Sequence, residues 1–181
     1  MKQINTYINE KLRMTSKRQY TCQPKDKKEL RQIIIDRIIM EGDECDLNDI
    51  DTSKITDMFN LFAVDFNKIF KNFNGDISMW DVSNVKDMRY MFFRCENFNC
   101  DISYWNVSKV DNMNNMFSNC TNFNCDISKW DVSNVEDMQY IFYNCEEFNQ
   151  DLDSWNVSHV KNMNYAFYNC PTRPEWYINK K

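Results

Sequence analysis

The stretch FNGDISMWDVSNVKDMRYMFFRCEN, residues 73–97, is followed by three near-copies of itself that begin at Phe98, Phe123 and Phe148. A fixed period of 20 to 50 residues is typical of stacked repeats, in which each unit buries its apolar face against its neighbours. The columns that do not vary are Trp80, Trp105, Trp130, Trp155; Val82, Val107, Val132, Val157; Val85, Val110, Val135, Val160; Phe92, Phe117, Phe142, Phe167; and Cys95, Cys120, Cys145, Cys170. The repeat therefore decides the fold.

A looser copy precedes these four. The stretch DLNDIDTSKITDMFNLF, residues 46–62, has Asp, Leu, Ser, Ile, Met and Phe in the columns that hold Asp76, Ile77, Ser83, Val85, Met88 and Phe92, with five extra residues before Phe73. The array is therefore expected to contain five units.

The spacing of apolar residues changes within a unit. In DISMWDV, residues 76–82, apolar and polar residues alternate, which predicts a short half-buried strand. From Val85 onwards the spacing predicts one face of a helix of about three turns, and the serine at Ser83, Ser108, Ser133 and Ser158 is placed to cap that helix. The predicted fold class is an α/β solenoid, a leucine-rich-repeat-like stack of strand–helix units with an N-terminal helical cap.

The two ends differ from the array. Residues 1–24 are expected to be flexible, and Met1 and Met14 are both candidate starts. Residues 25–45 are expected to form the helical cap, because residues 25–41 have the apolar spacing of an amphipathic helix after Pro24. The solenoid is assigned to residues 46–175 and a C-terminal tail to residues 176–181, with Trp176 placed to lie over the last open edge.

Composition excludes several classes of function. The chain has 181 residues, a net charge of −5 and only 2 glycines, so it lacks the residues of a phosphate-binding loop. An acidic body argues against nucleic-acid binding, which needs a basic stripe. No stretch approaches the roughly 18 apolar residues of a membrane span, and no signal peptide is visible. We therefore expect no membrane insertion and an intracellular location, in the cytoplasm or in a virion.

The polar columns favour structure over catalysis. The asparagine column of Asn74 and the aspartate column of Asp76 are expected to satisfy backbone groups at turns. Calcium binding by the aspartates is the less favoured alternative, because such loops need glycines. The eight cysteines lack the close pairs of zinc sites and are expected to be reduced and buried. His159, the only histidine, lies in a variable column. We expect no enzyme activity, no metal and no cofactor.

The motif W-[DN]-V-S-x-V-x-x-M-x-x-[MIA]-F-x-x-C-x-x-F-N-x-D-[IL] resembles the repeat of the BspA-like leucine-rich-repeat family, also described as the mycoplasma-type 25-residue surface-protein repeat. The resemblance covers about residues 25–170. It implies a non-enzymatic array of the kind implicated in adhesion on bacterial surfaces and also present in giant DNA viruses and some protists. The lack of a secretion signal favours an intracellular member, such as one from a giant virus.

The columns that vary are candidates for partner binding. Aromatic residues at i and i+3 on the outer side of the predicted helices are the first candidates: Tyr90, Phe93, Tyr140, Tyr143, Tyr165 and Tyr168. The alternative reading is that these rings only cover the neighbouring helix. A second candidate surface is the strand column of Met79, Tyr104, Lys129 and Ser154. The predicted function is a protein–protein interaction module with an unidentified protein partner; the alternative is a structural or packing protein, for example a virion or surface component.

Overall fold

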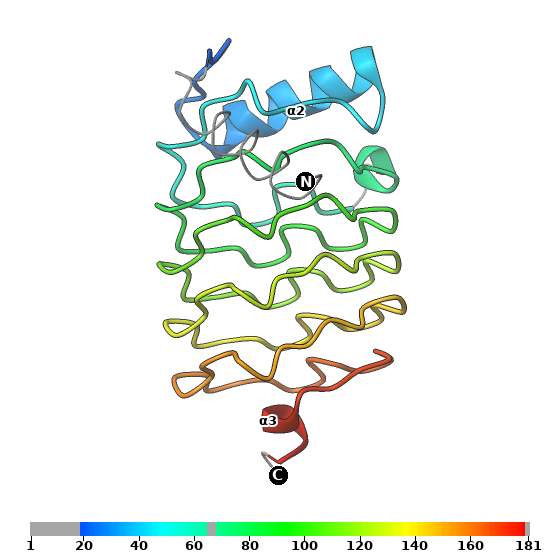
Figure 1. Ribbon diagram of the computed structural model, residues 1–181. Helices are drawn as coiled ribbons and strands as arrows, with labels where there is room; N and C mark the ends of the chain where they lie inside the picture. The colour runs from blue at the N-terminus through cyan, green and yellow to red at the C-terminus, as the bar shows by residue number, and fades with distance from the viewer. Residues whose placement is uncertain (1–18, 65–67, 180–181) are drawn as a thin grey trace, which may run out of the picture.

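The computed structural model describes residues 19–64 and 68–179 of the chain. Figure 1 shows a stack of coils, with one helix lying across each end. We number the coils 1 (43–64), 2 (73–97), 3 (98–122), 4 (123–147) and 5 (148–172). The helical elements are α2 (Lys27–Glu41), the 3-10 helix η1 (Lys68–Phe70) between coils 1 and 2, and α3 (Glu175–Ile178).

The α/β solenoid of strand–helix units predicted from the sequence is wrong. Helix accounts for 14% of the structure and isolated bridge residues for 6%, and no strand or sheet forms among the described residues. Neighbouring coils are joined instead by isolated parallel bridges. One column of these bridges links all five coils, at Asp57, Asp87, Asn112, Asp137 and Asn162. The predicted strand at 76–82 and the predicted helix from Val85 are both chains of turns.

Three side-chain-stabilised turns in each coil explain why no helix forms. In coil 2, the Oδ1 atoms of Asp76, Asp81 and Asp87 accept from the backbone N–H two residues later, at 3.0, 3.0 and 2.9 Å. This bond holds the backbone in a turn and competes with helix formation. Ser83 is one of the donors, so its backbone N–H is held in a turn and it caps no helix. The equivalent bonds recur in the other coils.

Left-handed residues complete the exclusion of a helix. Tyr90 and Arg94 have φ values of 57° and 63°. A right-handed helix needs negative φ values, so a positive φ at two positions four residues apart excludes a helix there. Each sits before the last residue of a turn closed by an i to i+3 hydrogen bond, Met91 N to Met88 O (3.2 Å) and Cys95 N to Phe92 O (3.0 Å). Because these turns bring an apolar residue inward about every three positions, they imitate the spacing of a helix.

The interior is a set of aromatic columns that run through the stack. The rings of Phe92 and Phe117 lie 5.6 Å apart and nearly parallel, as do those of Phe117 and Phe142 at 5.7 Å. The Trp130 indole is 4% exposed, and its Nε1–H donates to the carbonyl of Ile102 in the preceding coil at 3.1 Å. Equivalent indole bonds are made by Trp80, Trp105 and Trp155. Burial of the invariant columns, which the repeat predicted, is therefore observed except at Val157 and Cys170 of coil 5, which are partly buried.

The asparagine column forms the ladder expected of it. The Oδ1 atoms of Asn74, Asn99 and Asn124 accept from the backbone N–H of the next asparagine along the stack, at 2.8, 2.8 and 3.1 Å. The carboxylates of the Asp76 column accept from backbone N–H groups of their own coil, and those of Asp76 and Asp101 also accept from a thiol of the next coil. Among the residues that the structure describes, no group of three or more His, Cys, Asp or Glu side chains is arranged to hold a metal ion.

Replacing Asn124 tests this ladder. Asn124→Ala removes the acceptor for the Asn149 N–H and for the Gln150 side chain, so it should lower the free energy of unfolding by on the order of 1–2 kcal/mol. Asn124→Asp keeps an acceptor oxygen and should cost less. Urea unfolding followed by tryptophan fluorescence measures both, and equal losses would show that the ladder bond contributes little.

The helix α2 covers the N-terminal end of the stack. It begins at the N-cap Asp26, whose side chain accepts from the Glu29 N–H, and it buries Leu30, Ile34 and Ile38. The amphipathic pattern at residues 25–41 thus predicted a real helix. Residues 19–23 lie beside coil 1, where the Thr21 N–H donates to the Asp49 carbonyl at 2.9 Å. The predictions for residues 1–18, including the choice between Met1 and Met14, lie outside the described residues.

Trp176 of α3 covers the other end. Its ring stacks on Trp155 at 6.4 Å, and its Nε1–H donates to the Leu152 carbonyl at 2.8 Å. Each tryptophan of the array makes the same kind of bond to the coil before it, so Trp176 takes the place that the tryptophan of a sixth coil would occupy. The register is broken at Pro171, yet the tryptophan column continues for one more ring.

Substitutions along the tryptophan column test this cap. Trp130→Ala should cost on the order of 3–5 kcal/mol, because it leaves a large cavity and removes one of the two hydrogen bonds that the Ile102 carbonyl accepts. Trp155 is equally buried beneath Trp176, so Trp155→Ala should cost about as much although it lies in the last coil. Chemical denaturation is the measurement, and a clearly smaller loss at Trp155 would show that Trp176 does not act as a cap.

Candidate functional site

Four of the six candidate aromatic residues come together on one surface. Tyr140 stacks on Tyr165 at 5.4 Å and 3°, and Tyr143 stacks on Tyr168 at 5.0 Å and 11°. Within each coil the two rings meet edge to face, at 5.6 Å in coil 4 and 6.2 Å in coil 5. We call these four residues the tyrosine cluster. Tyr165 and Tyr168 are 56% and 50% exposed, so the cluster has an accessible end.

The other two candidates lie in a separate group. Tyr90 and Phe93 meet edge to face at 5.5 Å, and Tyr90 also contacts Phe59 at 6.1 Å. Between this group and the tyrosine cluster, coil 3 has Asn115 and Ser118, which are only 9% and 2% exposed. The six aromatic residues therefore form two surfaces.

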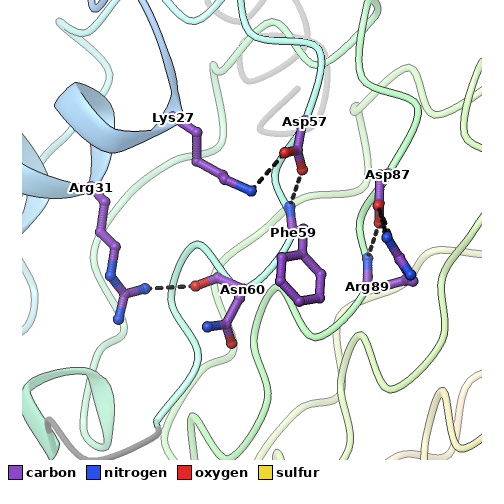
Figure 2. Close-up of polar contacts among 7 residues, drawn as sticks. All are labelled: Lys27, Arg31, Asp57, Phe59, Asn60, Asp87 and Arg89. Carbon is purple, nitrogen blue, oxygen red and sulfur yellow. Dashed lines mark hydrogen bonds and ion pairs between the residues drawn. The ribbon is translucent and has the colours of Figure 1, made fainter.

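Sequence analysis missed Phe59, which Figure 2 shows beside Asn60 and Asp57. Lys27 and Arg89 each carry their positive charge 5.1 Å from the centre of its ring, an attractive cation–π arrangement. Phe59 occupies the column of Arg89, one residue before the tyrosine column, in the unit that matches the repeat least well. The one signal in the sequence was that Phe59 is an aromatic residue directly before the tyrosine column.

The backbone under the tyrosines is unusual for such bulky residues. Tyr90, Tyr140 and Tyr165 have φ values of 57°, 56° and 57°, a region that costs about 1–2 kcal/mol for residues other than Gly, Asn and Asp. Asn60 and Asn115 occupy the same column in coils 1 and 3, and asparagine adopts this conformation more readily. The tyrosines are therefore not required by the turn.

The alternative surface lies on turns and contains no strand. Met79, Tyr104, Lys129 and Ser154 each sit at the third position of a turn closed by a hydrogen bond from the following tryptophan N–H, as in Trp80 N to Ile77 O at 3.1 Å. Tyr104 is 68% exposed. It borders an open hollow of about 420 Å³ that is also lined by Lys129, Asp101 and Asp126.

The groups with potential reactivity are held in passive environments. All eight cysteines are unpaired, and burial raises the pKa of Cys100 and Cys170 to about 12 and that of Cys125 to about 11. Burial also raises the pKa values of Cys95, Cys120 and Cys145 well above the usual range. Thiols in this state are poor nucleophiles and metal ligands at neutral pH.

The buried cysteines have a structural role. The Sγ–H groups of Cys120 and Cys145 donate to the carbonyls of Phe92 and Phe117 in the preceding coils, at 2.9 and 3.0 Å. The only histidine, His159, is exposed, and its Nδ1 lies 2.6 Å from the Ser133 carbonyl. Among the described residues, no helix is long and apolar enough to cross a membrane.

The raised thiol pKa values predict a loss of stability at alkaline pH. The unfolded chain releases thiol protons above about pH 8.5, whereas the folded chain keeps them, so stability is full below that pH and falls as pH rises. Each fully buried thiol should contribute about 1.4 kcal/mol per pH unit to this loss. Urea midpoints at pH 8 and pH 10 measure it, and the Cys95→Ser/Cys120→Ser/Cys145→Ser variant should show a shallower fall. If the stability of that variant falls as steeply between pH 8 and pH 10, thiol ionisation is not the cause of the loss.

Comparison with known proteins finds one family. A family model described as "Mycoplasma protein of unknown function, DUF285" matches residues 37–124 and again residues 64–176. No curated protein and no solved structure matches the chain. Together the two overlapping matches span coils 1 to 5 and most of the chain. A second match that is offset along the chain is what a repetitive sequence gives. The protein therefore belongs to this Mycoplasma-type family of unknown function.

Proposed function

We propose that the protein is a non-enzymatic interaction module that binds a protein partner through the tyrosine cluster. The observation that carries this proposal is the presence of Tyr140 and Tyr165 at a left-handed position where asparagine suits the backbone better. Residues kept in a costly conformation are found at functional sites. Here the unfavourable backbone conformation holds two tyrosine rings in place, and one of them, Tyr165, is more than half exposed.

The chemistry of the cluster suits a protein interface. Tyrosine is enriched among residues that contribute most to binding, because it offers a large rigid surface and a hydroxyl group. The four rings are already stacked on a rigid array, so little conformational entropy is lost when a partner binds. Tyr140 and Tyr143 are half-buried by their neighbours, whereas Tyr165 and Tyr168 remain available for contact.

The array itself supplies the variant that tests the proposal. Tyr165→Asn/Tyr168→Ser gives coil 5 the same pair that coil 3 has at Asn115 and Ser118, so the backbone should tolerate it. The matched control is Tyr104→Lys, which removes an exposed ring from the alternative surface and introduces the residue of the next coil, Lys129. Both variants should keep the circular dichroism spectrum of the wild type.

The experiment has two steps. A photo-crosslinking amino acid at position 168, and separately at position 104, identifies by mass spectrometry the proteins that each surface contacts in the cells that produce the protein. Calorimetry with the purified partner should then show at least about tenfold weaker binding for the double variant, equivalent to the loss of about 1.4 kcal/mol, and unchanged binding for Tyr104→Lys.

Two outcomes would contradict the proposal. If the double variant binds as tightly as the wild type, the tyrosines serve only packing, as the structural alternative requires. If Tyr104→Lys weakens binding instead, the surface of Met79, Tyr104, Lys129 and Ser154 is the interface.

The proposal includes a reducing intracellular setting, the cytoplasm or a virion, and a BspA-like origin of the repeat. Its support is the set of eight unpaired cysteines, which persist as thiols where disulfides are rare. Cell fractionation with a thiol-labelling reagent tests the setting, and recovery of the protein from an extracellular fraction would contradict it.

A further inference from the structure

Along one side of the stack, four columns of hydrogen bonds between coils run in a single direction. From coil 2 to coil 3, the N–H groups of Met88, Tyr90, Phe92 and Arg94 donate to the carbonyls of Asn112, Asn114, Met116 and Ser118, at 2.9 to 3.0 Å. The same four columns donate in the same sense at each of the other three interfaces. In the neighbouring column the direction is reversed, because the N–H groups of Asp111, Glu136 and Lys161 donate to carbonyls of the preceding coil.

The left-handed turns explain this one-way pattern. In an ordinary strand, each edge alternates N–H donors and carbonyl acceptors. Here the carbonyls of the donor residues are used inside their own coil, as in Met91 N to Met88 O and Phe93 N to Tyr90 O. Over these four columns, the N-terminal edge of each coil is therefore a row of carbonyls, and the C-terminal edge is a row of N–H groups.

The carbonyl row of coil 1 is covered. Figure 2 shows Arg31 of α2 reaching the carbonyl of Asn60, at 2.6 Å, and Lys27 reaching the carboxylate of Asp57. Arg31 also donates to the carbonyl of Leu61, a member of the row. The helix thus brings cationic donors to the end of the stack that presents acceptors.

The N–H row of coil 5 has no such cover over most of its length. Within the described part of the chain, the N–H groups of Met163, Tyr165, Phe167 and Asn169 make no hydrogen bond. Phe167 lies under Tyr177, with ring centres 5.1 Å apart, and is buried. Tyr165 and Asn169 are exposed and Met163 is partly exposed. Three donors therefore face outward at the C-terminal end.

We propose that this edge binds a repeat coil of the same type presented by a second protein, which extends the ladder by its carbonyl row. Over these four columns the edge offers only donors, so an ordinary strand would set N–H against N–H at alternate positions. A repeat coil offers only acceptors, as residues 112–118 do in this chain. A following coil with rings in the two tyrosine columns would also continue the stacks that end at Tyr165 and Tyr168.

Self-association at this edge is disfavoured in both orientations. Two copies that meet end to end through coil 5 would bring donors to donors. A head-to-tail pair would need the carbonyl row of coil 1, but α2 lies across that end of the stack (Figure 1) and its Arg31 already donates to the Leu61 carbonyl of the row. The partner is therefore a different protein of the same repeat type whose first coil is uncovered.

Nuclear magnetic resonance of the full ¹⁵N-labelled chain tests the proposal at the atoms concerned. The probe is the synthetic peptide VEDMQYIFYN, residues 135–144, which presents this carbonyl row to coil 3 within the array. A scrambled peptide and inorganic phosphate are the controls. The expected result is a saturable downfield shift of the Met163, Tyr165 and Asn169 amide protons with the repeat peptide alone.

A matched pair of variants separates this edge from the tyrosine cluster. Met163→Pro removes one unpaired donor without breaking any internal bond, and Asn162 before it is extended in its bridge to Asp137, which suits a following proline. Affinity for the peptide should fall several-fold in Met163→Pro and stay unchanged in Met163→Leu. Both keep all four tyrosines, so a failure here leaves the proposed tyrosine interface standing.

Three results would overturn the inference: equal shifts with the scrambled peptide, shifts with phosphate only, or an unchanged affinity in Met163→Pro. If Met163→Pro does not fold, the wild-type comparison of the three probes still decides, because it needs no variant.

Discussion

The hydrogen bond from a backbone N–H to the carboxylate or amide oxygen two residues earlier is the interaction on which this structure depends. It occurs three times in each coil, at the columns of Asp76, Asp81 and Asp87. Each such bond bends the chain and frees other backbone groups to pair with the next coil. Because of these bends the chain completes one coil in 25 residues, so that the phenylalanines and tryptophans of successive coils lie above one another in columns. Apolar burial then stabilises a path that polar side chains have defined.

Much of the packing was readable from the repeat, whereas the local conformation was not. The period identified Trp130, Phe117 and Cys120 as core residues, which are buried. The apolar spacing assigned a helical cap to residues 25–45, and the structure has a helix at Lys27–Glu41. The helix prediction failed because turns of three residues and a helical period of 3.6 give nearly the same spacing over ten residues. The left-handed backbone at Tyr90 gave no warning, since tyrosine is rare there.

The candidate site was predictable in part for the same reason. Column positions placed Tyr140, Tyr143, Tyr165 and Tyr168 on one outer surface, and the structure brings their rings together. The repeat did not reveal that Asn115 and Ser118 would be buried between two aromatic groups, because burial there depends on the size of the neighbouring rings. Nor did it reveal Phe59, whose contacts with Lys27 and Arg89 cross from the cap to coil 2.

The one-way hydrogen bonds between coils also give the stack an electrical polarity. In ordinary sheets the peptide dipoles largely cancel, but here those of four columns point along the stack axis and add, as they do along an α-helix. The negative pole lies at coil 1, where Lys27 and Arg31 sit, and the positive pole lies at coil 5. As in a helix, the partial charges reside on the unpaired groups at the two ends. A longer array of such units would therefore separate the two poles further without changing the charge at either one.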